Sequence, residues 1–405
     1  MLEAESIVVR LFLVAALFPY ISIIPLSSDT QPWSLVLSAI GCALLLSRIR
    51  LYPIHWALLL LATAAAAMLA LEGGGVGSLR NAVGYISMFL IAVMTTHAMR
   101  THGHTVARFL DISILIWLGV GVIQRVFFKD AFTFLLGSAR TSESRGVISL
   151  APEPTYFATM ILLMVLWRAS LELKVWHAVV LLVVVVALAS SAQVVIVLLL
   201  SASVLTFCLL FNPKYYLVAA GILAAGGVGA GTIILFLQSS RLGALAQLAI
   251  HNPSFILAQD ASANERFVHI FAGLRSIVDK SFLPNGLLTQ PWIEYVNGVI
   301  HQFPKLFWVP QYGDRIFSAA GAILFQMGFL CLPLVVLCVS AMTRWSKATA
   351  YKLTWSAAFV LTLLTALPLS HPLIGVLFGV IAYIGSKRGD YIADPSQDDT
   401  VYAMN

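Results

Sequence analysis

Charge is the scarcest property of this sequence. Only 10% of the 405 residues are charged, whereas soluble domains carry roughly 25%. A soluble globular domain is therefore excluded. The apolar residues, which make up 60% of the chain, gather in repeated runs of roughly 20, the length that crosses a bilayer as a helix. The runs are continuous rather than alternating, which excludes a transmembrane β-barrel.

Cysteine is also scarce, and its placement excludes two further classes. The four cysteines all fall inside apolar runs, at Cys42, Cys208, Cys331 and Cys338. This placement suggests neither a disulfide framework nor a thiolate zinc site. The outer loops contain no paired-carboxylate metal motif, so we expect no metal and no cofactor. The net charge of +6 needs no nucleic-acid partner, because cytoplasmic loops of membrane proteins are enriched in Lys and Arg.

The apolar runs predict an all-α polytopic membrane protein with about twelve transmembrane helices. The first run is expected to be a retained helix rather than a signal peptide, because it lacks a small-residue cleavage site. The expected spans lie near 10–26, 32–47, 53–71, 81–98, 109–127, 154–170, 175–190, 192–211, 215–237, 316–341, 353–369 and 372–386.

Basic residues in alternate short loops predict that both termini are cytoplasmic. Examples are Arg48 with Arg50 and Arg100 with Arg108. We therefore expect a single transmembrane domain over residues 1–386, a large structured external loop over 238–315, and a polar cytoplasmic tail over 387–405.

Two outer segments carry arginines that this rule does not explain. One is the polar island from Arg145 to Glu153, just before the sixth expected span. The other is the long loop, with Arg241, Arg266, Arg275 and Arg315. Because a guanidinium binds carboxylates and phosphates bidentately, an anionic ligand is the natural candidate.

The long loop has a helical pattern of its own. Ser262-Ala263-Asn264-Glu265 has capping-box spacing and predicts a helix to about Lys280. An apolar stripe at helical spacing follows, formed by Phe267, Phe271, Leu274 and Val278. At about 100° per residue, Arg266 and Arg275 point to nearly opposite faces, whereas Arg266 and His269 share one.

Three elements in order resemble a known family. They are Arg145-Gly146 followed by Glu153-Pro154-Thr155, an arginine-led helix ending in a Pro/Gly turn from Arg266 to Gly286, and a later helix with Gly321 and Gly328. With about twelve spans, this layout resembles the Wzy-type O-antigen and exopolysaccharide polymerases, and the O-antigen ligases share the same architecture.

Two departures from the family pattern bear on this choice. Ser190, Ser191 and Gln193 stand where such chains often have a basic or Thr-rich cluster. His301 is followed by Gln302 rather than by the asparagine that is frequent in the ligases. The second departure places the polymerase ahead of the ligase.

The resemblance implies metal-independent glycosyl transfer on the periplasmic face of a bacterial inner membrane. The donor would be an oligosaccharide on undecaprenyl pyrophosphate, and the acceptor another lipid-linked repeat unit. A chain-length regulator (co-polymerase), a flippase and membrane lipid are the implied partners. The build is similar to multispan, GT-C-like glycosyltransferases that use lipid-linked donors.

This chemistry needs cations for the leaving pyrophosphate and a base for the acceptor hydroxyl. The candidate cations are Arg145, Arg266, Arg275, Arg241 and Arg315, and the candidate catalytic residues are Glu153 and His301. Each has a simpler interpretation. The arginines can form ion pairs or anchor the chain at the interface, and Glu153 can be ordinary helix punctuation, since Pro154 suits a first helical position.

Three other functions stay open. The O-antigen ligase would transfer glycan to lipid A-core. A transporter or flippase would need broken helices or midplane charges, and only the glycine-rich stretch 226–231 points that way. A structural membrane subunit would leave the external arginines unexplained.

Overall fold

The protein is built almost entirely of helices. The computed structural model describes residues 2–22, 24, 30–140, 146–211, 261–308, 316–365 and 367–393, with isolated positions between 212 and 260. Within these residues the only β-type pairing is an isolated bridge between Ile21 and Leu136. The α-helices are α1 Leu2–Leu17, α2 Trp33–Leu44, α3 Pro53–Glu72, α4 Val76–Thr101, α5 Gly103–Val126, α6 Pro154–Leu171, α7 Val175–Leu182, α8 Ala192–Leu210, α12 Ala261–Asp279, α13 Thr289–Gln302, α14 Ala319–Met327, α15 Leu332–Arg344, α16 Thr349–Thr365 and α17 Pro372–Ala393.

The polytopic membrane class is confirmed at a coarser level than expected. In the part of the chain that the structure describes, six helical stretches are long and apolar enough to cross a membrane. Three shorter apolar helices accompany them, at Trp33–Leu44, Val175–Leu188 and Pro372–Ser386. The expected count of about twelve is therefore not reached by this criterion. The ninth expected span, 215–237, lies outside the described residues.

Helices α4, α6 and α17 form the centre of the bundle. Most of α4 and α6 is buried inside the protein, whereas α8 exposes most of its surface. The contact between α4 and α17 is close because Gly375 and Gly379 face it. An added Cβ at Gly379 would lie 2.6 Å from the Ala92 carbonyl oxygen. Small residues of this kind let membrane helices approach until their backbones touch.

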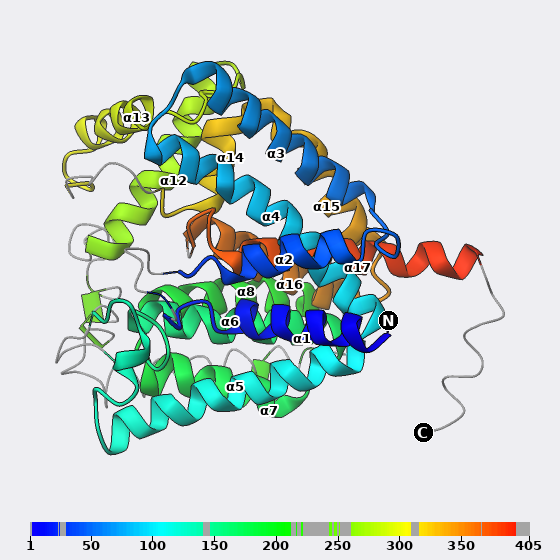
Figure 1. Ribbon diagram of the computed structural model, residues 1–405. Coiled ribbons are helices and arrows are strands. Elements are labelled where there is room, and N and C mark those ends of the chain that lie inside the picture. The colour runs from blue at the N-terminus through cyan, green and yellow to red at the C-terminus, as the bar shows by residue number, and fades with distance from the viewer. Residues whose placement is uncertain are drawn as a thin grey trace.

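The two ends of the bundle differ in what they carry. The start of α1 and the end of α17 lie at one end, and α12 and α13 lie toward the other (Figure 1). The end with α12 and α13 is called the loop end below. The first residues of α14 also belong to it, because α12 packs along α14. The start of α6 belongs to it as well, because the charge of Glu153 acts on Glu265 of α12.

The run expected as one helix over 316–341 is broken at Gly328. This residue has φ +50°, and it separates α14 from a 3₁₀ turn and α15. The backbone groups that the break frees are bonded to the turn after α12. The Phe329 amide donates to the Phe282 carbonyl at 2.7 Å, and the Phe325 carbonyl accepts from the Asn285 amide at 3.1 Å. The turn therefore completes a helix that would otherwise leave polar groups in an apolar environment.

A second break lies between α7 and α8. The π-helix Val183–Leu188 follows α7, and Ser190 then takes φ +49° before α8 begins. The Leu188 carbonyl accepts a 2.8 Å hydrogen bond from the Val147 amide. The two short spans expected here are thus two helices joined by a corner, which the polar-island segment braces.

Helix α12 confirms the expected helix but corrects two details. The helix already runs at Ala261, so Ser262 is not its N-cap. Asn264 instead donates to the Leu306 carbonyl at 2.7 Å. Only the later part of the apolar stripe is exposed: Leu274 is 47% and Val278 75% exposed, whereas Phe267 packs against the core. The opposite face is buried because it packs along α14, where an added Cβ on Gly273 would lie 2.9 Å from the Gly321 Cα.

The close approaches at the two breaks predict a stability effect. A Cβ at Gly146 would lie 2.2 Å from the Leu188 carbonyl oxygen, and a Cβ at Gly328 would lie 2.3 Å from the Phe282 carbonyl oxygen. We expect Gly146→Ala and Gly328→Ala each to lower the free energy of unfolding by about 1–3 kcal/mol, as overpacking does. Thermal melting of the detergent-purified protein measures this effect.

Gly119→Ala is the matched control. Gly119 lies inside α5, and nothing stands within 4 Å of an added Cβ. Alanine there should raise stability by roughly 0.5–1 kcal/mol through helix propensity. Equal melting temperatures for all three variants would contradict the bracing of the breaks by these loops.

Candidate functional site

Glu153 occupies the N-cap position of α6, but its side chain forms no capping hydrogen bond. Pro154 stands at the first helical position, as expected. Helix punctuation therefore accounts for Pro154 but not for the Glu153 carboxylate, which is half-buried at the loop end.

The backbone leading to Glu153 is held rigidly by α5. Gln124 bonds Ser149 twice: its Oε1 accepts from the Ser149 amide at 2.6 Å, and its Nε2 donates to the Ser149 carbonyl at 3.0 Å. The Ser149 hydroxyl donates to the Trp117 carbonyl at 2.7 Å. Ser149 itself has φ +53°, an unfavourable conformation that this network enforces. The carboxylate is thus presented from a preorganised segment.

The buried residues of α12 include several polar ones. Arg266 is only 7% exposed, and His269, on the same face, and Asn264, one turn earlier, are fully buried. The Nδ1 atom of His269 accepts from the Phe317 amide at 3.0 Å, and its ring stacks on Phe317. Among the described residues, no hydrogen bond or ion pair within 4 Å engages the Arg266 guanidinium. A buried cation in this position favours binding of an anion.

Electrostatics brings Glu153 and the start of α12 together. Burial raises the pKa of Glu265 above its usual value. The Arg266 charge opposes this rise, and the Glu153 charge adds to it. Glu153 and Glu265 therefore lie close enough to repel each other. The two sequence elements, separated by more than a hundred residues, meet in one cluster, which we call the Glu153–Arg266 cluster.

A small polar pocket adjoins this cluster. Its volume is about 60 Å³, and its polar lining includes Tyr20, Arg80, Tyr156 and His371. Tyr156 lies one turn after Glu153 on α6. The pocket wall at Phe317 stacks on His269 of α12. Because ligand sites usually measure roughly 300–1,000 Å³, this pocket takes one group of a ligand rather than a whole oligosaccharide.

The pocket holds a buried Tyr–His pair. The Tyr20 hydroxyl and His371 Nε2 are 2.8 Å apart, and His371 Nδ1 accepts from the Leu373 amide at 3.2 Å. Burial lowers the pKa of His371 to about 3, so the ring is neutral at neutral pH. With Nδ1 accepting, the ring proton sits on Nε2 and is donated to Tyr20.

Arg275 and His301 form a separate group. Arg275 Nε donates to Asp279 at 3.3 Å, and its Nη1 donates to Gln302 Oε1 at 3.2 Å. His301 is exposed at the end of α13. As expected from helical geometry, Arg275 points away from Arg266. Within the described residues, the contacts of Arg275 reach α13, and no hydrogen bond or ion pair joins His301 to the Glu153–Arg266 cluster.

Three of the expected site residues, Arg145, Arg241 and Arg315, lie outside the described residues. Of the motif around Arg145, the structure describes Gly146 and the residues that follow. In the part of the chain that the structure describes, no three His, Cys, Asp or Glu side chains come together in a way that could hold a metal ion.

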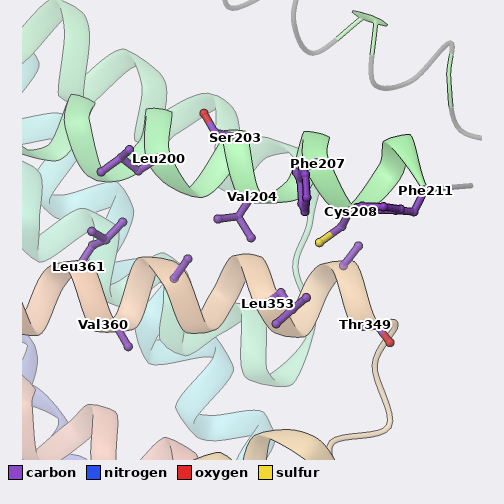
Figure 2. A pocket seen from close by; sticks show the side chains of 12 residues that line it. Leu200, Ser203, Val204, Phe207, Cys208, Phe211, Thr349, Leu353, Val360 and Leu361 are labelled. Carbon is purple, nitrogen blue, oxygen red and sulfur yellow. The ribbon is translucent and has the colours of Figure 1, made fainter.

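Two apolar grooves flank α16. Figure 2 shows side chains of α8 and α16 facing each other across the first, which measures about 910 Å³. Leu200, Val204 and Phe207 line it from α8, and Leu353 and Leu361 line it from α16. The second groove, of about 750 Å³, lies between α15 and α16 and reaches α14 and α17. We call these the α8–α16 groove and the α15–α16 groove.

Sequence reasoning missed several residues of the site. Arg80 lies near the start of α4, in a segment that is otherwise poor in basic residues. The reasoning applied to the outer arginines could also have identified it as a candidate anion ligand. The sequence pattern marks Glu265 only as the last residue of a capping-box spacing. The contact between Tyr20 and His371 left no usable signal, because these residues are 351 positions apart in the sequence and only the fold brings them together.

Comparisons with known proteins do not identify the site. No family model matches the chain, and no curated protein matches it. The likeness to Wzy-type polymerases therefore stays an expectation that the sequence elements carry.

The raised pKa of Glu265 predicts a pH-dependent stability. The carboxyl group is harder to ionise in the folded protein than in the unfolded chain, so its contribution is complete below the usual value of 4.5. This contribution is lost as the pH rises through the raised folded-state pKa. We expect Glu265→Gln to melt at a higher temperature than the wild type at neutral pH, with the difference vanishing toward about pH 4. Melting curves across this range measure it.

Two further variants make the pH experiment specific. Glu153→Gln removes a repulsion, so the pH dependence of the Glu265 contribution should move to lower pH. Glu294→Gln, at an exposed position of α13, should leave the melting profile unchanged. A difference between Glu265→Gln and wild type that is constant with pH would contradict the raised pKa.

Proposed function

We propose that the protein is a glycosyltransferase that polymerises oligosaccharide repeat units carried on undecaprenyl pyrophosphate. The reaction takes place at the loop end of the bundle, on the periplasmic face of a bacterial inner membrane. One observation carries the proposal: the Glu-Pro element and the arginine-led helix, chosen from the sequence, meet in the Glu153–Arg266 cluster beside a polar pocket. The membrane-embedded helical fold supports a lipid-linked substrate.

The chemistry divides between cations and carboxylates. The acceptor hydroxyl attacks the anomeric carbon of the donor sugar, the bond from that carbon to the pyrophosphate oxygen breaks, and the hydroxyl proton passes to a base. Arg266 stabilises the charge that develops on the pyrophosphate, because its guanidinium is preorganised and shielded from water. Arg80 in the pocket wall is a second cation for the same group.

The base is one of the two clustered carboxylates. Glu265 suits the role because its raised pKa moves it toward the operating pH. Glu153 then holds the pKa of Glu265 up and orients the arginine. His301, expected as a base from the sequence, is exposed at the end of α13 and, among the described residues, makes no contact with the cluster.

The two helix breaks at first suggest a transporter, but their hydrogen bonds do not favour that function. Broken membrane helices bind substrates in transporters through their freed backbone groups. Here the freed groups at Phe325, Phe329 and Leu188 are bonded to the chain's own loops. They are therefore engaged in the fold rather than offered to a ligand. The ligase has no observation in its favour beyond the shared architecture.

Replacing Arg266 tests the proposal. In a strain whose own copy is deleted, Arg266→Ala should abolish long-chain polysaccharide and leave single-repeat material, because the leaving group loses its cation. Arg266→Lys should retain part of the activity, because it keeps the charge but loses the bidentate fork. Gel profiles of polysaccharide length, with membrane protein level measured in parallel, give the result.

Lys280→Ala is the matched control, since Lys280 is exposed just after the last turn of α12. It should give normal chain lengths. Purified protein supplied with lipid-linked repeat units in detergent should also lengthen chains without a second compartment, which a pure transporter cannot do. Normal chain lengths from Arg266→Ala at wild-type protein level would overturn the proposal.

A further inference from the structure

The loop that follows α5 exposes several aromatic rings. Residues 127–136, which we call the phenylalanine loop, contain Phe127, Phe128, Phe132 and Phe134. Phe127 is 69%, Phe128 74% and Phe134 80% exposed. Since a fully buried aromatic side chain covers roughly 150–250 Å², these three rings alone leave on the order of 400 Å² uncovered. Soluble surfaces rarely carry apolar patches larger than a few hundred Å², and larger patches mark interaction sites.

The backbone of the phenylalanine loop is held in place by the rest of the protein. The Ser22 amide donates to the Leu135 carbonyl at 2.7 Å, and the Leu135 and Leu136 side chains pack against the core. The Ala131 carbonyl accepts from Gln124 Nε2 at 2.7 Å. The loop therefore turns its leucines inward and holds its phenylalanines outward.

The exposed rings continue the lipid-facing side of α5. This helix is long and apolar enough to cross a membrane, and its exposed apolar residues recur at helical spacing. They are Ile112, Leu115, Ile116, Val122 and Val126. Phe127 and Phe128 follow Val126 directly, so the surface that faces lipid along α5 runs on into the phenylalanine loop.

Two arginines indicate the depth at which the loop lies. Arg108 and Arg125 stand 17 positions apart on α5, which is about 26 Å at 1.5 Å per residue. The hydrocarbon core is roughly 30 Å thick, and arginines near helix ends reach toward the headgroups at its boundaries. Since the phenylalanine loop follows Arg125, it lies where acyl chains meet headgroups at the loop end. Phenylalanine side chains seat at this depth in interfacial segments.

We infer that the phenylalanine loop inserts into the lipid leaflet at the loop end, with its rings among the acyl chains and Arg125 at the level of the phosphates. The bilayer is the occupant because the exposed surface continues the lipid-facing side of α5 directly, so both face the same medium. The cation beside the rings complements the phosphates of the headgroups.

The inserted loop is coupled to the segment before Glu153 through one side chain. Gln124 Nε2 donates to the Ala131 carbonyl in the phenylalanine loop and also, at 3.0 Å, to the Ser149 carbonyl. Gln124 Oε1 accepts from the Ser149 amide at 2.6 Å. A single amide group thus ties the loop and the Glu153 segment to the same point of α5. The contact with the bilayer therefore fixes the height of Glu153 relative to the lipid headgroups.

Spin labels measure the depth of the loop. In the full chain with its native cysteines replaced by alanine, Phe128→Cys and Phe134→Cys are each labelled with a nitroxide, in vesicles of phosphatidylethanolamine and phosphatidylglycerol. Leu115→Cys, on the lipid-facing side of α5, and Glu294→Cys, exposed on α13, are the lipid and water references. We expect both loop labels to collide with dissolved oxygen more often than with a water-soluble nickel chelate, as at Leu115 and unlike at Glu294.

Two outcomes would overturn the insertion. Nickel-chelate accessibility equal to that at Glu294 would place the rings in water. Low accessibility to both reagents would show that protein, such as a second copy of this chain, covers them.

A paired substitution tests the coupling to Glu153. Phe128→Ser with Phe134→Ser should speed deuterium exchange at the Ser149 amide several-fold in the same vesicles, because the bilayer no longer holds the loop. Phe207→Ser with Phe211→Ser removes two rings of similar exposure from α8 and should leave that amide unchanged. Equal exchange in both pairs would overturn the coupling. Neither measurement involves glycan transfer, so normal chain lengths from Arg266→Ala would remove the polymerase and leave the inserted loop standing.

Discussion

The fold depends on one constraint: a backbone group freed inside an apolar environment must find a partner. Two helices are broken, at Gly328 and between Leu188 and Ser191, and each break leaves carbonyl or amide groups to satisfy. Both are satisfied by loop segments of the same chain. Those segments are the turn after α12 and the polar island before α6. The first directly follows the helix that carries Arg266, and the second leads to Glu153. Satisfying the breaks therefore also positions the site.

This coupling explains why a membrane-boundary site can be rigid. Loops are usually the mobile part of a protein, and a site that binds pyrophosphate needs fixed donors. Gln124 and Trp117 hold the segment before Glu153 from one side, and α14 holds α12 from the other. The Pro/Gly turn is also pinned, since Leu287 donates to Glu72 at the end of α3. Glu153, Glu265 and Arg266 are thus carried on braced backbone.

The sequence predicted the structural class and the relative orientation of side chains on a helix better than it predicted which side chains are buried. Apolar run length indicated a polytopic helical protein, and helical spacing placed Arg266 and Arg275 on opposite faces. The same reasoning could not tell which face of α12 is buried. An apolar stripe normally packs inward in a soluble protein, but beside a membrane the apolar face can point outward and the polar face can line a site. The environment, which a sequence pattern does not encode, decides between them. The Tyr20–His371 contact was beyond prediction for a related reason, because no local pattern links residues so far apart.

The surroundings of the buried Arg266 side chain help to decide whether this residue stabilises the fold or binds a ligand. A buried guanidinium that served stability alone would be expected in a close, hydrogen-bonded pair, because desolvating an unpaired charge is costly. Arg168 shows that arrangement in this protein, since its Nε donates to Asp111 at 3.0 Å and His177 donates to the same carboxylate oxygen. Arg266 is buried to a similar degree, but among the described residues it makes no such close pair, and its charge acts on the neighbouring carboxylate of Glu265. Glu265 in turn keeps a raised pKa, so it does not fully offset the cation. An anionic ligand that displaces water from the polar face of α12 would complete the pairing, and pyrophosphate has the charge and the geometry to do so.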